Sequence, residues 1–199
     1  FCKYLIIIII GLSSSNIYAE DFTISDGTTQ TSRVTLTNSD TLTIAEGGTL
    51  NYYWPAVDAD NRSFSSGTTQ VTNSGTITGA GYLVDFRSST NATLVNHGTM
   101  TATSSSRALY INNSDNTTIT NNGTIQISSS SAYEAIDGDS TTDLTIINNA
   151  DATISSAGDD AIAIASAEDV TITNAGTISA ADDNIIEGRL RCSSKGYCF

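Results

Sequence analysis

The chain is patterned as short runs of alternating apolar and polar residues rather than as long stretches with helical periodicity. The segment 119–125, Ile-Thr-Asn-Asn-Gly-Thr-Ile, places β-branched residues on both sides of an Asn-Gly pair. β-branched residues favour strands, whereas Asn and Gly accept the backbone angles of tight turns. The pattern therefore predicts two short strands joined by a turn, and it argues against helices in such segments.

This segment recurs along the chain. Aligned on the asparagine, the copies are separated by 35, 23, 25, 27 and 26 residues, at Asn38, Asn73, Asn96, Asn121, Asn148 and Asn174. A second apolar segment follows each of the later copies, as at 83–86, 108–111 and 161–164. Repeats of this length mark solenoids and related arrays. One unit cannot bury its own apolar residues, but stacked units place like residues about 4.8 Å apart. We therefore predict an all-β, right-handed parallel β-helix (β-solenoid) of about six coils.

The recurring asparagine is expected to point inward at the turn. Side-chain amides stacked in this way can pass hydrogen bonds from coil to coil and satisfy backbone groups that the turn leaves unpaired. We interpret all six asparagines as a structural ladder rather than a ligand site.

The ends of the chain differ from its middle. Residues 1–19 combine Lys3, an apolar run over 5–12 and a small-polar exit ending at Ala19, which predicts a secretory signal peptide. Residues 20–188 form the predicted β-helical domain, and 189–199 are an atypical basic tail containing Cys192 and Cys198. Because the repeat stops at 188 without a recognisable cap, we expect a section of a longer stack with an open end. Open strand edges template self-association.

The long first interval predicts an insertion loop at 51–66, which holds the only Trp and the only Pro of the chain. Its first aromatic residues are Tyr52, Tyr53 and Trp54. They either cover a neighbouring turn or provide a contact surface, since binding residues often lie in such loops.

Composition narrows the possible partners. At 199 residues and a net charge of −13, the chain is one acidic domain without a basic cluster outside its tail. Nucleic-acid binding needs Lys and Arg against phosphates, so we expect no nucleic-acid partner. We also expect no cofactor.

The repeated Thr-Asn-x-Gly-Thr-Ile, the predicted export signal and the acidic, Thr/Ser/Asn/Gly-rich body resemble the passenger region of Gram-negative autotransporters over residues 20–188. Filamentous-haemagglutinin-like secreted proteins are the close alternative. The resemblance implies an exported protein at the cell surface or outer membrane, or secreted, that acts as an adhesin or structural stalk. It also implies partners among host or neighbouring-cell surface molecules or glycans. Its own outer-membrane translocator barrel would be a further partner.

A polysaccharide lyase or glycosidase of the β-helix type is the enzymatic alternative. Such sites use clustered carboxylates for acid–base work or calcium binding. The candidates are Arg107 with Asp137, Asp139, Asp159, Asp160, Asp182 and Asp183. The chain offers little length for the walls of a substrate groove, and the single histidine, His97, falls at a turn position. We therefore predict no enzyme activity and no catalytic or metal-binding residues.

Alignment of the second apolar segment makes one further prediction. It stacks Arg107 over Glu134, with Asp160 and Asn184 at the next two positions. An exposed pair of this kind contributes only about 0–1 kcal/mol, so we expect it to set the register of the coils rather than their stability.

Overall fold

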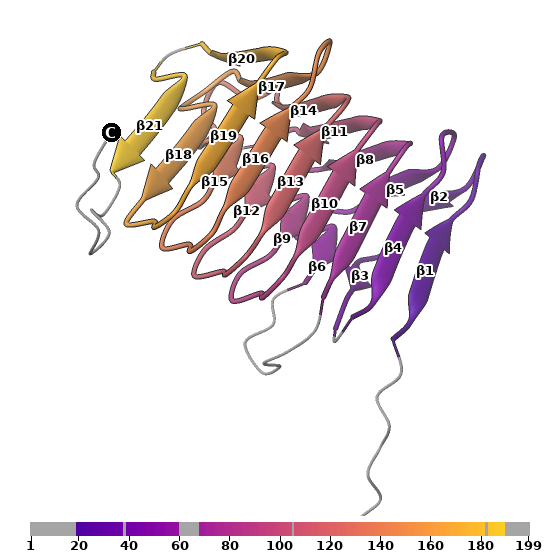
Figure 1. Ribbon diagram of the computed structural model, residues 1–199. Coiled ribbons are helices and arrows are strands. Elements are labelled where there is room, and N and C mark those ends of the chain that lie inside the picture. Colours follow the sequence, from indigo (N-terminus) through magenta and orange to yellow (C-terminus); the bar gives the residue numbers. More distant parts are fainter. Residues whose placement is uncertain (1–18, 38, 60–67, 105, 182, 190–199) are drawn as a thin grey trace, which may run out of the picture.

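A computed structural model describes residues 19–37, 39–59, 68–104, 106–181 and 183–189. The described chain winds as an all-β stack of coils, from the indigo N-terminal coil to the yellow C-terminal coil of Figure 1. Each coil contributes one strand to each of three parallel sheets, and each sheet has seven strands within the described residues. From β1 to β19 the chain thus makes six turns. The predicted parallel β-helix is confirmed.

The three sheets follow the three strand positions of a coil. Sheet A contains β1 (Asp21–Ile24), β4 (Thr41–Ile44), β7 (Gln70–Asn73), β10 (Thr93–Asn96), β13 (Thr118–Asn121), β16 (Thr145–Asn148) and β19 (Thr171–Asn174). Sheet B contains β2 (Thr29–Gln30), β5 (Thr49–Asn51), β8 (Thr76–Gly79), β11 (Thr99–Ala102), β14 (Thr124–Ile127), β17 (Thr153–Ser156) and β20 (Thr177–Ala180). Sheet C contains β3 (Val34–Thr35), β6 (Val57–Asp58), β9 (Val84–Asp85), β12 (Leu109–Tyr110), β15 (Ile136–Asp137), β18 (Ile162–Ala165) and β21 (Ile186–Arg189).

The core is a set of aliphatic columns that run along the axis. In sheet A, Leu94 pairs in register with Val71 on one side and Ile119 on the other, and all three are buried. Alternate residues of each strand point inward because successive side chains leave a strand on opposite faces. The Thr residues between them point outward, which explains the alternation of apolar and polar positions in the sequence.

Five asparagines form a continuous inner column where sheet A meets the turn to sheet B. The side-chain nitrogen of each donates to the side-chain oxygen of the next, over 2.8 Å from Asn73 to Asn96 and 2.8 Å from Asn96 to Asn121. The column continues over 2.9 Å to Asn148 and 2.8 Å to Asn174. The first four are fully buried, so the amides satisfy one another away from water.

The first coils depart from the predicted alignment. Asn38 lies outside the described residues, and the position paired with Asn73 is held by Ile44, which itself pairs with Ile24. The true second copy is therefore Thr41–Ile44 with Thr49–Asn51, and the predicted alignment on Asn38 was wrong. An aliphatic residue fills the column there, so no asparagine marks these two coils in the sequence.

The predicted insertion at 51–66 is also partly incorrect. Val57–Asp58 is strand β6 of sheet C, in register with β3 and β9. Ala56, Val57 and Ala59 are fully buried in the core. The short apolar run therefore belongs to the stack, whereas residues 60–67 lie outside the described part of the chain.

The predicted signal peptide lies outside the described residues except for Ala19, and most of the predicted tail, with Cys192 and Cys198, lies outside them as well. Arg189 still belongs to strand β21, one residue beyond the predicted end of the stack. In the part of the chain that the structure describes, no helix is long and apolar enough to span a membrane.

Candidate functional site

Two adjoining hollows lie along the corner where sheet B gives way to sheet C. One, of about 240 Å³, is lined by Tyr53, Trp54, Ala80, Gly81, Tyr82, Ser104, Ser106, Arg107 and Tyr133. The other, of about 670 Å³, is lined by Thr31, Asn51, Tyr52, Tyr53, Thr78, Gly79, Ala80 and Thr103. Both hollows share Tyr53 and Ala80, so we treat them as one site, the aromatic groove.

Aromatic rings from successive coils contact one another along this corner, and two of them, Trp54 and Tyr82, line the groove. Trp54 meets Tyr82 edge-on, with ring centroids 5.7 Å apart, and Tyr82 lies 4.8 Å from Tyr110 in a tilted arrangement. Such offset or edge contacts are the geometries that aromatic pairs prefer. The rings therefore form a partly stacked row across neighbouring coils.

Gly81 determines how closely this row packs. A Cβ atom at Gly81 would lie within 2.2–2.4 Å of three side-chain atoms of Trp54. Only glycine leaves the space in which the indole lies against the next coil. The indole is therefore held in place while 47% of Trp54 remains exposed.

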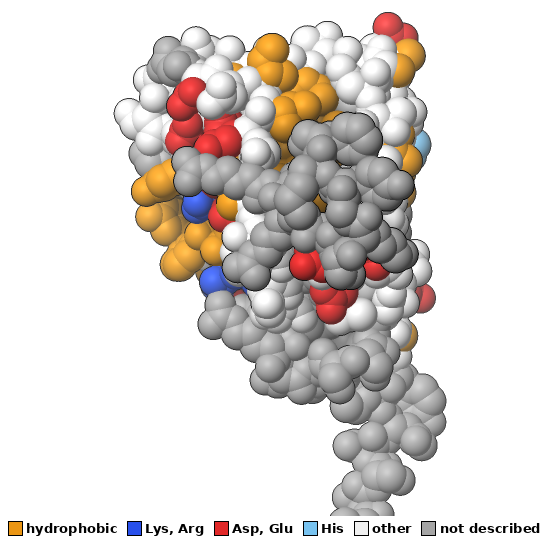
Figure 2. All heavy atoms as spheres, turned by 60° about the vertical axis from the view of Figure 1, so that its left-hand side comes forward, with side chains coloured by type: hydrophobic (Ala, Val, Ile, Leu, Met, Phe, Trp, Pro, Cys, Tyr) orange, Lys and Arg blue, Asp and Glu red, His pale blue; other side chains and the backbone are white. Residues whose placement is uncertain are grey.

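Arginines are inserted between the tyrosines. The guanidinium of Arg87 lies 5.8 Å from the ring centre of Tyr82 and 5.1 Å from that of Tyr110. Arg107 lies 5.1 Å from Tyr110 and 4.7 Å from Tyr133. Cations within about 6 Å of an aromatic face are attracted to it. In Figure 2, basic side chains lie next to hydrophobic ones at the left of the molecule.

Carboxylates hold both arginines. Arg87 makes a two-pronged contact with Asp85, with nitrogen–oxygen distances of 2.9 Å and 2.6 Å. Arg107 contacts Glu134 at 2.8 Å and Asp137 at 2.5 Å. The predicted stacking of Arg107 over Glu134 is therefore confirmed. Glu134 and Asp137 are only 8% and 2% exposed, however, so the prediction of an exposed pair was wrong.

Burial and charge act in opposite directions on this cluster. Burial lowers the pKa of the Arg107 guanidinium, but the charges of Asp137 and Glu134 outweigh it and leave the pKa above its ordinary value. Burial raises the pKa of Asp137 to about 7 although Arg107 favours its charged form. Burial likewise raises the pKa of the Tyr110 hydroxyl, with Asp137 adding to the effect. Arg107 therefore stays charged, whereas Asp137 titrates near neutral pH.

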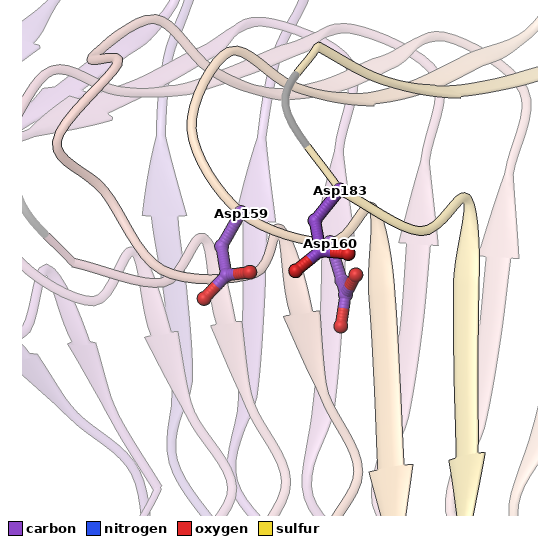
Figure 3. A group of neighbouring side chains, drawn as sticks. All are labelled: Asp159, Asp160 and Asp183. Atoms are coloured by element: carbon purple, nitrogen blue, oxygen red, sulfur yellow. The ribbon is translucent and has the colours of Figure 1, made fainter.

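A group of carboxylates lies farther along the stack, before strands β18 and β21. One oxygen each of Asp159, Asp160 and Asp183 lie within 4.8 Å of one another (Figure 3). Asp160 is buried and accepts a hydrogen bond from the backbone of Asn184 at 2.8 Å. Burial, with smaller contributions from Glu187 and from the nearby carboxylates of Asp159 and Asp183, raises the pKa of Asp160 to about 6, although the hydrogen bond from Asn184 lowers it.

Two further carboxylates proposed for an enzyme site are Asp139 and Asp182. Asp139 lines a hollow of about 200 Å³ together with Glu134, Asp159 and Asp160. Its side chain accepts a hydrogen bond from the backbone of Ala165. Asp182 lies outside the described residues. His97 is exposed in the turn between β10 and β11.

The three predicted contact residues differ in exposure. Tyr53 and Trp54 are exposed in the groove, at 73% and 47%. Tyr52 is half-buried against the core and lies 6.0 Å from Arg33. Sequence reasoning missed Tyr82, Tyr110, Tyr133 and Arg87. The sequence marks the three tyrosines only by position, since one tyrosine precedes or lies in the sheet C strand of each of three successive coils.

The fold and the groove define a β-helical protein with an aromatic, charge-paired corner. The family described as BigA third pectate lyase-like domain matches residues 18–195. Because this match covers most of the chain, the chain belongs to that family. Neither the curated proteins nor the solved structures compared with the chain contain a match.

Proposed function

We propose that this chain is the β-helical part of an adhesion protein exposed at the cell surface, and that it binds carbohydrate in the aromatic groove. The observation that carries the proposal is the row of aromatic rings from Trp54 to Tyr110, with Arg87 and Arg107 between the tyrosines. Ligand sites typically combine aromatic surfaces with a few placed polar groups. An aromatic ring offers a flat apolar face to the carbon side of a sugar ring.

The β-helix supplies a rigid support for such a site. The groove is lined from several coils, and each coil is held to the next by parallel strand pairing. Trp54 is also confined by Gly81 and Tyr82. A site that is already ordered loses less conformational freedom on binding. This preorganisation favours recognition over a role as a passive stalk.

Export, surface display and an outer-membrane translocator barrel are part of the proposal. They are supported by the predicted signal segment and by the resemblance to autotransporter passengers. Self-association through open strand edges stays a prediction of the same kind. The family description names a pectate lyase-like domain. This description supports a β-helical fold related to carbohydrate-acting proteins, and it points to no particular partner.

A lyase is the second candidate, favoured by that description and by the carboxylates of Asp159, Asp160 and Asp183. An elimination reaction needs a base that gives up its proton near the working pH. In the groove, Arg107 fits this role poorly, because Asp137 and Glu134 raise its pKa. Asp137 and Asp160 have pKa values raised to about 7 and about 6, but neither lines the groove. We therefore propose binding without cleavage.

Binding of the purified chain to an array of immobilised glycans tests the proposal. We expect at least one glycan to retain the protein, and we expect the change Trp54→Ala to abolish retention while the fold is kept. His97→Ala, in an exposed turn away from the groove residues, is the matched control. Retention that survives Trp54→Ala would contradict the assignment of the groove. Release of unsaturated sugar products, followed by ultraviolet absorbance, would contradict binding without cleavage.

A further inference from the structure

The proposed function leaves open which class of glycan binds in the groove. The paired charges and the exposed aromatic rings of the groove indicate that class. We infer that the aromatic groove takes an uncharged oligosaccharide and discriminates against acidic ones. This inference rests on the proposed function, since it names the ligand class of the same groove.

The first observation is where exposed aromatic surface gathers. The exposed large hydrophobic residues of the described chain are Tyr53, Trp54, Tyr133, Ile185 and Ile186. All three aromatic members line the same hollow. Exposed apolar surface concentrated in one groove marks a binding site rather than random scatter. The ring faces suit the apolar side of uncharged sugar rings.

The second observation is that Arg107, which lines the groove, and the neighbouring Arg33 and Arg87 are all paired with carboxylates within the described part of the chain. Arg33 pairs with Asp58, Arg87 with Asp85, and Arg107 with both Glu134 and Asp137. Among the described residues these three arginines thus meet four carboxylates, so no positive charge is left over whether Asp137 is ionised or protonated. An acidic glycan would have to displace a carboxylate to pair with one of these arginines. The chain as a whole carries −13, so its long-range field opposes acidic ligands as well.

The third observation is the supply of uncharged polar groups along the rim. Asn51, Thr78 and Ser104 line the two hollows and carry amide or hydroxyl groups. These groups can both donate and accept hydrogen bonds, as the hydroxyls of a neutral sugar require. Apart from the paired Arg107, the polar groups that line the groove are therefore uncharged.

The length of the groove indicates a chain rather than a single sugar. Its lining comes from four successive coils, through Tyr53, Ala80, Ser104 and Tyr133. Three steps between coils at about 4.8 Å span about 14 Å. We therefore expect affinity to rise with the number of sugar units until this span is filled.

Calorimetric titration of the purified chain with neutral and acidic oligosaccharides of matched length tests the inference. The probes are short cello-, manno- and chito-oligosaccharides against oligogalacturonate. We expect a neutral series to bind with an affinity that changes little between low and high salt, because no ion pair forms. Trp54→Ala should weaken this binding at least about tenfold. Binding of oligogalacturonate alone, sensitive to both salt and Trp54→Ala, would overturn the ligand class but leave the glycan-binding groove intact. Absence of binding to every probe would count against the proposed function itself.

A second variant tests the reason for the discrimination. Glu134→Gln combined with Asp137→Asn releases Arg107 from its two carboxylates. We expect this variant, checked for a cooperative melt, to gain affinity for oligogalacturonate by at least about tenfold. An unchanged preference in the folded variant would contradict the role given to the paired charges. Glu20→Gln with Asp21→Asn, at the far end of the stack, is a control with the same change of net charge.

Discussion

The side-chain nitrogen of Asn121 donates to the side-chain oxygen of Asn148 at 2.9 Å, within the buried part of the column that begins at Asn73. Asn121 also donates to the backbone oxygens of Gly123 and Thr153, and it accepts from Asn96 and from the backbone of Gly123. One side chain thus satisfies polar groups of three coils.

Asn121→Ala should therefore destabilise the protein by about 1–3 kcal/mol, because several buried donors and acceptors lose their partner. Denaturant unfolding followed by circular dichroism measures this difference. The matched control is Asn122→Ser in the same turn. Asn122 is half-buried and its side chain accepts a hydrogen bond from Asn149, which serine can still accept in part, so its change should cost less. Equal losses of stability for the two variants would refute the ladder as the main contribution.

Arg107→Gln should cost about 3 kcal/mol at neutral pH, because it leaves the buried Glu134 without its cation. Asp137, whose pKa is already raised to about 7, should take up a proton in this variant. The control is Arg33→Gln, whose partner Asp58 lies in a more exposed pair. Such pairs contribute about 0–1 kcal/mol. Thermal melts of both variants measure the contrast. Similar melting temperatures would contradict the account of Arg107 as a bridge between buried carboxylates.

Gly123→Ala should destabilise the stack because a Cβ atom there would lie 2.2 Å from the backbone oxygen of Gly98 in the preceding coil. Backbone must move to relieve this contact, at a cost of about 1–3 kcal/mol or more. Gly188→Ala is the control, since no atom lies within 4 Å of its added Cβ. A chemical denaturation curve for each variant gives the comparison. If Gly123→Ala unfolded at the same denaturant concentration as the wild type, neighbouring coils would be able to move apart without loss of stability, which would contradict this account.

Stability should fall as pH rises through the neutral range. The folded protein raises the pKa of Asp137 to about 7 and that of Asp160 to about 6, from an ordinary value of 3.8. The unfolded chain therefore loses these protons at lower pH, and the folded state binds more protons between about pH 4 and pH 7. The stabilisation is complete below the unfolded pKa and is lost as pH approaches the folded one.

Unfolding free energies at about pH 5 and about pH 8 check this direction. Asp137→Asn should flatten the dependence, because the amide has no proton to lose. Asp151→Asn, which changes an exposed carboxylate in the turn before β17, is the control. A stability that instead rises steadily over this range would show that the ion pair with Arg107 keeps Asp137 ionised.

The repeat in the sequence was sufficient to predict the coil and most of its register. Asn73, Asn96, Asn121, Asn148 and Asn174 share one column because each must fill the same buried turn. The first coils were misaligned because Ile24 and Ile44 fill this position with a side chain that needs no partner. An apolar filler carries no distinctive sequence signal.

The groove was only partly predictable for a different reason. Its residues come from corners of unequal length, so Trp54, Tyr82 and Tyr133 do not recur at a fixed interval. Their proximity depends on how each corner folds outside the regular strands. Tyr53 and Trp54 were found because they form a local aromatic cluster. The pairing of Arg107 with Glu134 was found because both precede the second apolar segment at the same distance.

The most direct test of glycan binding uses the single tryptophan of the chain, Trp54, which is half-exposed in the groove. Its fluorescence can be followed while a neutral oligosaccharide is added, and the signal reports on this groove because no other tryptophan contributes. We predict a saturable change in emission with the same dissociation constant as calorimetry, removed by Tyr133→Ala and unaffected by His97→Ala. Binding detected by calorimetry with no change in Trp54 emission would contradict the account and place the ligand elsewhere on the protein.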